Sequence, residues 1–189
     1  FLGNHDMGRA GYLLRGGLTL AQLRKADLLA HDVMFLTRGI PSILYGDEVG
    51  MLGGGDKAAR QDMFSTMVKA WKEEERIWGD PIGIRNSFNI VTPLTTRLTL
   101  LNKLRKDHPA LASGAQILRM QSGSVMVNSR IDAGNRTEYV VAFNSGDKER
   151  KVSVQISTRS STFTTLLGSG EFTSDATGKL TVKIGRAHV

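Results

Sequence analysis

The sequence contains no cysteine, which excludes disulfide bonds, thiolate metal sites and a cysteine nucleophile. It has no apolar run long enough to cross a bilayer, so we expect no membrane partner. Aromatic residues make up only 6% of the chain and do not alternate with the basic residues. Because binding to single-stranded nucleic acid combines basic grooves with stacking aromatics, the net charge of +7 predicts a solvated surface and no nucleic-acid partner.

The 189-residue chain is 40% apolar, which is normal for one globular domain or two small ones. Frequent glycines predict a loop from Met7 to Gly17. Thr19 can then cap a helix whose apolar residues fall on one face and whose end is set by Gly39.

Beyond this helix the pattern changes to a buried strand and a long connection. Pro41 prevents further helix, and Ile43–Tyr45 predicts a compact apolar strand. The connection that follows contains a possible short helix from Ala58 to Trp71, and a last helix is expected over Pro93–Lys106. Helix, short connection and buried strand form the repeating unit of an α/β barrel.

After His108-Pro109 the sequence changes to short, largely β-branched runs separated by turn residues. Such a pattern predicts an antiparallel β-sandwich of about six strands. The expected strands are Ile117–Met120, Ser124–Ile131, Thr137–Asn144, Lys151–Ile156, Phe163–Leu167 and Lys179–Ile184.

Three short motifs carry a resemblance to a known family. Phe1-Leu2-Gly3-Asn4-His5-Asp6 resembles the FxxNHD segment that closes the seventh barrel strand in the α-amylase family, glycoside hydrolase family 13. The segment from Arg38 to Gly50 resembles the family's eighth-strand GxPxxYYGDExG segment, with Leu44 in place of the first tyrosine. Arg60-Gln61-Asp62-Met63-Phe64 is similar to an R-x-x-M-x element in the following loop. The resemblance implies the C-terminal part of a (β/α)8 TIM barrel followed by a β-sandwich, domain C.

The first motif also implies candidate site residues. By resemblance, Asp6 is the carboxylate that stabilises the transition state of a retaining glycosidase, His5 bonds sugar hydroxyls, and Asn4 helps to orient the site. Each residue also has an ordinary structural interpretation. Asp6 could cap the next turn, His5 could be a hydrogen-bonded structural imidazole, and Asn4 could hold the loop.

The second motif contributes a pair of acids that we interpret as rim or structural residues. Neighbouring side chains at a strand end point to opposite sides, so Asp47 and Glu48 are not expected to flank one bond. Arg60 is expected to pair with one of them, and Tyr45 is expected in the core. Three aromatic residues could stack on sugar rings, although core packing is their more frequent use: Phe64, Trp71 and Trp78.

The resemblance also predicts what this chain does not supply. The family's nucleophile and general acid follow the fourth and fifth barrel strands, so we expect the chain to have no glycosidase activity alone, whereas the full-length protein acts on an α-glucan or oligosaccharide. We expect no metal or other cofactor in this fragment, with calcium left open for the full-length protein. Some family members bind chloride through the asparagine of the first motif and a basic residue near the eighth strand, positions that Asn4 and Arg38 could match, but chloride is not expected here.

Several alternatives remain open from the sequence. The full-length protein could be a transglycosylase or sugar isomerase of the same family, or a catalytically inactive scaffold protein, and the sandwich could bind sugar. We expect the barrel part to span 1–108 and the sandwich 109–183. Residues 184–189 resemble the in-frame translation of a sequencing adapter and are expected to be an added tail.

Overall fold

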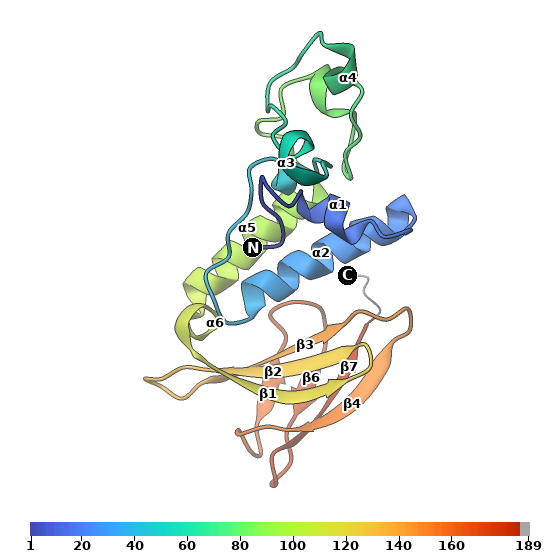
Figure 1. The fold of residues 1–189 in the computed structure, drawn as a ribbon. Coiled ribbons are helices and arrows are strands. Elements are labelled where there is room, and N and C mark those ends of the chain that lie inside the picture. The colour runs from blue at the N-terminus through green and yellow to red at the C-terminus, as the bar shows by residue number, and fades with distance from the viewer. Residues whose placement is uncertain (186–189) are drawn as a thin grey trace. The chain divides into compact units, whose positions relative to one another are not determined.

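The computed structural model describes residues 1–185, in which helices are followed by antiparallel strands (Figure 1). The chain divides into two compact units. Unit 1 comprises Phe1–Met34 and Pro41–Leu101, and unit 2 comprises Phe35–Ile40 and the chain from Asn102 onward. Of the suspected tail, 186–189 lie outside the described residues, and Ile184 is the last residue of a strand.

The predicted helix after Thr19 is confirmed as α2, Leu20–Leu36. Its N-terminus is closed by a reciprocal cap, in which the Gln22 N–H donates to Thr19 Oγ1 (3.3 Å) and the Thr19 N–H donates to Gln22 Oε1 (2.9 Å). The preceding 7–17 segment was expected to be loop, but it contains the short helix α1, Ala10–Leu14. Gly11 permits this helix to pack closely, since a Cβ there would lie 2.4 Å from Ile77 Cδ1.

The predicted last helix of the first part is likewise confirmed as α5, Pro93–Asp107. Thr92 and Thr95 cap it, with the Thr95 N–H donating to Thr92 Oγ1 (3.0 Å) and the Thr92 N–H donating to Thr95 Oγ1 (2.7 Å). The leucines that repeat at helical spacing are all buried: Leu94, Leu98, Leu101 and Leu104.

The region between these helices differs from the expectation. Ile43–Tyr45 forms no strand, and the chain continues into a 3-10 turn, η1, Asp47–Val49. A strand is stabilised by hydrogen bonds to neighbouring strands, and every named strand within residues 1–185 lies between Ala115 and Ile184. Tyr45 was expected in the core, but its side chain is half exposed.

The long connection is mostly irregular, so the helix expected from Ala58 to Trp71 is wrong. It contains only α3 (Gly55–Ala58), α4 (Lys69–Lys72) and the 3-10 turn η2 (Ile82–Ile84). Side-chain acceptors compete with the helix here, because Asp62 Oδ1 accepts the Phe64 N–H (2.9 Å) and Thr66 Oγ1 accepts the Val68 N–H (3.1 Å).

After α5, unit 2 continues with α6, Pro109–Ser113, and then with antiparallel strands. One sheet has the order β1-β2-β3, and two smaller sheets pair β4 with β7 and β5 with β6. Their bounds are β1 Ala115–Ser122, β2 Val125–Ile131, β3 Glu138–Asn144, β4 Arg150–Gln155, β5 Thr162–Thr164, β6 Glu171–Thr173 and β7 Lys179–Ile184. Six of these strands were predicted, β7 with the observed bounds and the other five with shifted ends, and β6 was not predicted.

A single apolar cluster joins the strands of unit 2. Val127 on β2, Val154 on β4 and Leu180 on β7 are buried together, and Phe163 of β5 and Phe172 of β6 pack against them. The three sheets therefore share one hydrophobic core.

Candidate functional site

The residues singled out at the start of the chain form a tight turn in unit 1. Asn4 Oδ1 accepts the backbone N–H groups of Asp6 (2.9 Å) and Met7 (2.8 Å). The backbones of Asn4 and Gly8 also exchange two hydrogen bonds of 3.0 Å. The amide oxygen of Asn4 thus holds the turn, whose other side chains, His5 and Asp6, point into solvent with 52% and 66% of their side-chain surface exposed.

Glycine is needed on both sides of this turn because the backbone approaches itself closely. A Cβ on Gly3 would lie 2.6 Å from Gly8 O and from Ala10 N. Gly8 has φ +117°, in the region that favours glycine, and it bridges to Gly54. The position of Asp6 is therefore fixed by backbone packing, not by its own side chain.

Asp6 has two side-chain neighbours, an imidazole and a guanidinium. Its Oδ1 lies 3.2 Å from His5 Nε2 and 3.3 Å from Arg60 Nη2. Arg60 also donates from Nε to Asp56 Oδ1 (2.8 Å), so its guanidinium is held by two carboxylates. The expected pairing of Arg60 with Asp47 or Glu48 is wrong. All these groups are exposed, so water screens their mutual attraction and leaves Asp6 accessible to a ligand.

Asp47 instead forms a buried ion pair with Arg9, which the sequence analysis did not identify. Arg9 Nη1 lies 2.9 Å from Asp47 Oδ1, and the two side chains are 0% and 4% exposed. Arg9 Nη1 also donates to Tyr45 O (2.6 Å), and its Nε donates to Gln61 Oε1. Burial raises the pKa of Asp47 above its ordinary value, and the opposing effect of Arg9 only partly offsets it.

The side chains of Asp47 and Glu48 do not converge on a common point. Asp47 is buried against Arg9, whereas Glu48 is half-buried and its backbone oxygen accepts a hydrogen bond from Thr92 Oγ1 (3.4 Å). Arg9 follows the Asn4 turn directly, and Asp47 lies within the second motif. What the sequence could not show is that the two motifs meet.

A second buried polar cluster lies in the same unit. His31 Nδ1 is 2.8 Å from Asp27 O and 3.4 Å from Asp27 Oδ1, and Trp78 Nε1 donates to Asp27 Oδ2 (3.1 Å). Burial lowers the pKa of His31, but the hydrogen bonds and charge of Asp27, together with Asp47, outweigh it and raise the pKa above its ordinary value. This cluster fixes Trp78 as a core residue.

The other two aromatic candidates behave differently from Trp78. Trp71 and Phe64 expose 54% and 57% of their surface, and Phe64 packs edge-on against Phe88 with ring centroids 5.0 Å apart. Within residues 1–185, no three His, Asp or Glu side chains gather closely enough to hold a metal ion. None of the helices in this range is both long and apolar enough to span a membrane.

No protein-family model matches the chain. It is similar to an α-amylase of Streptomyces lividans, 39% identical over 191 residues, which covers 97% of this chain and 21% of that protein. It is also similar to a cyclomaltodextrin glucanotransferase of Geobacillus stearothermophilus, 33% identical over 130 residues, covering 69% of this chain and 14% of that protein. The chain therefore spans about a fifth or less of the length of these relatives.

Solved structures show the same fold. An Anoxybacillus α-amylase superposes with a TM-score of 0.75 at 23% identity, covering 99% of this chain and 35% of that chain. The α-amylase of Geobacillus thermoleovorans, solved in complex with acarbose, gives a TM-score of 0.75 at 21% identity, covering 99% of this chain and 36% of that one.

Proposed function

Because this chain belongs to the α-amylase family of glycoside hydrolases, we propose that it contributes the transition-state-stabilising carboxylate, Asp6, to an enzyme that cleaves α-glucans with retention of configuration. In this proposal, residues 1–108, which include all of unit 1, belong to a (β/α)8 barrel, and residues 109–183 form domain C. The partner is an α-glucan or oligosaccharide, and this part of the enzyme needs no cofactor.

The observation that carries the proposal is the rigid Asn4 turn, which presents His5 and Asp6 outward beside Arg60. A glycosidase transition state resembles an oxocarbenium ion, so a fixed carboxylate near the reacting ring stabilises the developing positive charge. The imidazole of His5, within 3.2 Å of Asp6, is placed to bond hydroxyl groups of the same ring. Asp47 and Glu48 act as supports at the rim, the first through Arg9.

Retaining cleavage also needs a nucleophile and a proton donor on the two sides of the bond. We propose that neither is among the acids of this chain. Asp47 is buried in its pair with Arg9, and Asp56 and Asp6 share one arginine. The 189-residue chain is therefore expected to be inactive by itself, and the longer protein that contains it active.

The test is steady-state hydrolysis of a maltooligosaccharide by the longer protein and its Asp6→Asn variant. We expect kcat to fall by about 10²- to 10³-fold, as when one preorganised stabilising group is removed from an active site. Asp147→Asn, which changes an exposed aspartate on unit 2, is the matched control and should leave kcat unchanged. Equal activity of the two variants would remove Asp6 from the mechanism.

A transglycosylase is the second candidate, because the chain is 33% identical to a cyclomaltodextrin glucanotransferase over 130 residues. Both reactions use the same carboxylates and differ in whether water or a sugar hydroxyl accepts the glycosyl group. Product analysis separates them. Linear products that shorten with time indicate hydrolysis, whereas cyclic or elongated products indicate transfer.

A further inference from the structure

Unit 1 buries three aspartates in its interior: Asp27, Asp32 and Asp47. Two of them are compensated by arginine. Arg97 donates to both oxygens of Asp32, at 2.8 and 2.9 Å, and Arg9 pairs with Asp47. Because an ionised carboxylate is costly to bury without a cation, the third aspartate, Asp27, also calls for a positive partner.

His31 is the side chain that supplies this charge. It is 1% exposed, and its Nδ1 lies 2.8 Å from Asp27 O and 3.4 Å from Asp27 Oδ1. A carbonyl oxygen only accepts hydrogen bonds, so Nδ1 carries a hydrogen, and Nε2 is the nitrogen that gains or loses the second proton. In its charged form, His31 gives Asp27 the cation that arginine gives to the other two aspartates.

The proton on His31 also acts on Asp47. Burial raises the pKa of Asp47, and Arg9, the backbone N–H of Ala10 and the charge of His31 oppose this rise. Charged groups reach this region from several parts of unit 1: Arg24, Asp27 and Asp32 of α2, Asp47 of η1, Arg97 of α5, and Arg9 immediately before α1. Loss of the His31 proton therefore removes a compensating charge from both Asp27 and Asp47.

Trp78 connects Asp27 to the second motif. Trp78 Nε1 donates to Asp27 Oδ2 (3.1 Å), and the indole packs against Gly50, where a Cβ would lie 2.6 Å from Trp78 Cδ1. The Ile77 N–H also donates to Gly50 O (2.7 Å). Gly50 directly follows η1, so Trp78 and its partner Asp27 hold this 3-10 turn in place.

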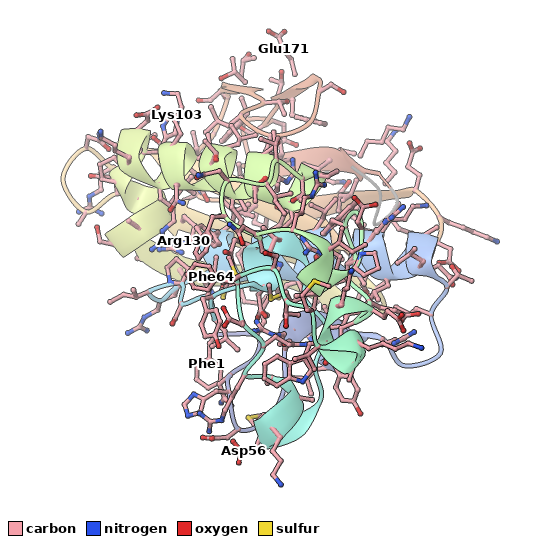
Figure 2. All side chains as sticks on the ribbon, turned by 90° about the horizontal axis from the view of Figure 1, so that it is seen from above. Phe1, Asp56, Phe64, Lys103, Arg130 and Glu171 are labelled. Atoms are coloured by element: carbon pink, nitrogen blue, oxygen red, sulfur yellow. The ribbon has the colours of Figure 1, made fainter. Side chains whose placement is uncertain are left out.

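The turn that contains Asp6 is tied to the same segment. Arg9 pairs with Asp47, and its backbone N–H donates to the glycine-rich loop that follows η1 (2.9 Å). The preceding Gly8 bridges to the residue just before α3, the helix that carries Asp56, labelled in Figure 2. The turn that presents Asp6 is therefore held by η1 and by the residues after it.

We propose that protonated His31 is a positioning residue for Asp6, which it supports through Asp27, Trp78 and the Arg9 pair of η1. His31 is buried and does not touch the substrate. When it loses its proton, the buried carboxylates beneath η1 lose a compensating charge, and the support of the Asp6 turn weakens. Turnover therefore falls as His31 deprotonates. This inference rests on the proposed function, because it requires Asp6 to act in catalysis.

The experiment compares kcat for a maltooligosaccharide between the longer protein that contains this chain and its His31→Gln variant, from about pH 6 to about pH 9. Glutamine is a neutral hydrogen-bonding side chain, so it represents the unprotonated imidazole at every pH. We expect parent kcat divided by variant kcat to be about tenfold at the acid end and to fall toward one at the alkaline end, since a small misplacement of catalytic groups costs up to about 10²-fold. Titration of the other catalytic groups is common to both proteins and cancels in this ratio.

Two controls separate positioning from a merely structural role. His108→Gln makes the same change in unit 2, where His108 Nδ1 lies 3.2 Å from the Tyr139 hydroxyl, and its ratio to the parent should not vary with pH. Circular dichroism at each pH gives the folded fraction to which kcat is normalised, so loss of folded protein does not enter the ratio. Histidine NMR, with the His31 signal identified by its absence from His31→Gln, gives the pH at which His31 titrates.

The ratio for His31→Gln should change at the pH where the His31 signal titrates. The inference is overturned if the normalised ratio is constant with pH, if His108→Gln shows the same pH dependence, or if the ratio changes at a pH where His31 does not titrate. A failure of the proposed function appears separately, as full hydrolytic activity of Asp6→Asn.

Discussion

Replacing Arg9 by methionine should destabilise unit 1 by about 3–5 kcal/mol, the usual consequence of removing one partner of a buried ion pair. Arg9 is fully buried and its partner Asp47 is 4% exposed. The substitution leaves the Asp47 carboxylate, Tyr45 O and Gln61 Oε1 without their Arg9 donors. Methionine fills much of the volume of the arginine side chain, so the loss of stability reports mainly on the polar contacts of Arg9.

The chain offers a matched control in Arg15, which pairs with Glu75 at the same distance of 2.9 Å. Those side chains are 52% and 70% exposed, so Arg15→Met should cost at most about 1 kcal/mol. The two pairs differ in burial and in the further hydrogen bonds that the buried Arg9 donates to Tyr45 O and Gln61 Oε1. A large difference between the two substitutions would therefore measure what burial and these buried hydrogen bonds add.

The assay is urea denaturation followed by tryptophan fluorescence, which reports on unit 1 because Trp71 and Trp78 both belong to it. A second variant, Arg9→Met with Asp47→Leu, should recover part of the loss because it removes the unpaired buried charge. Lowering the pH should also reduce the loss of unfolding free energy in Arg9→Met. Burial raises the folded-state pKa of Asp47, so protonation of this carboxyl at low pH removes the cost of burying its charge. Equal losses for Arg9→Met and Arg15→Met would refute this reasoning.

Two further predictions concern unit 1 and its helices. The pKa of His31 is raised in the folded state. Its contribution to the free energy of unfolding is therefore fully present below the unfolded-state pKa of about 6.5 and is lost as the pH rises through the folded-state pKa. Urea titrations from pH 6 upward should show falling stability in the parent and a flatter profile in His31→Gln; identical slopes would contradict the assignment. Thr92→Ala should remove the α5 cap and cost about 1 kcal/mol in a denaturant titration, whereas Thr99→Ala, on the exposed face of the same helix, should cost less.

The features that local chemistry determines were predicted from the sequence. Helices α2 and α5 begin at threonine caps whose signal lies within four residues, and their buried leucines follow the helical period. The longer strands of unit 2 follow the same logic, because β-branched runs are separated by turn residues. The three-residue strand β6, Glu171–Thr173, has too little sequence to carry a signal of its own.

The features that depend on distant parts of the chain were missed. Ile43–Tyr45 has the composition of a strand, but a strand forms only beside a partner. The predicted partner of Arg60 was also wrong. Arg60 contacts Asp56, one helical turn earlier, and Asp6, which lies 54 residues earlier in the sequence. Arg9 and His31 looked like ordinary polar residues because nothing local indicates that they are buried.

The most direct test of the central claim is a crystal structure of the longer protein, carrying Asp6→Asn, with a bound maltooligosaccharide. The residue at position 6 and His5 should lie within about 3 Å of hydroxyl groups on one glucose ring, which is hydrogen-bonding distance. A sugar chain bound in the cleft of that enzyme with position 6 and His5 out of contact with every ring would contradict the assignment of this turn to catalysis.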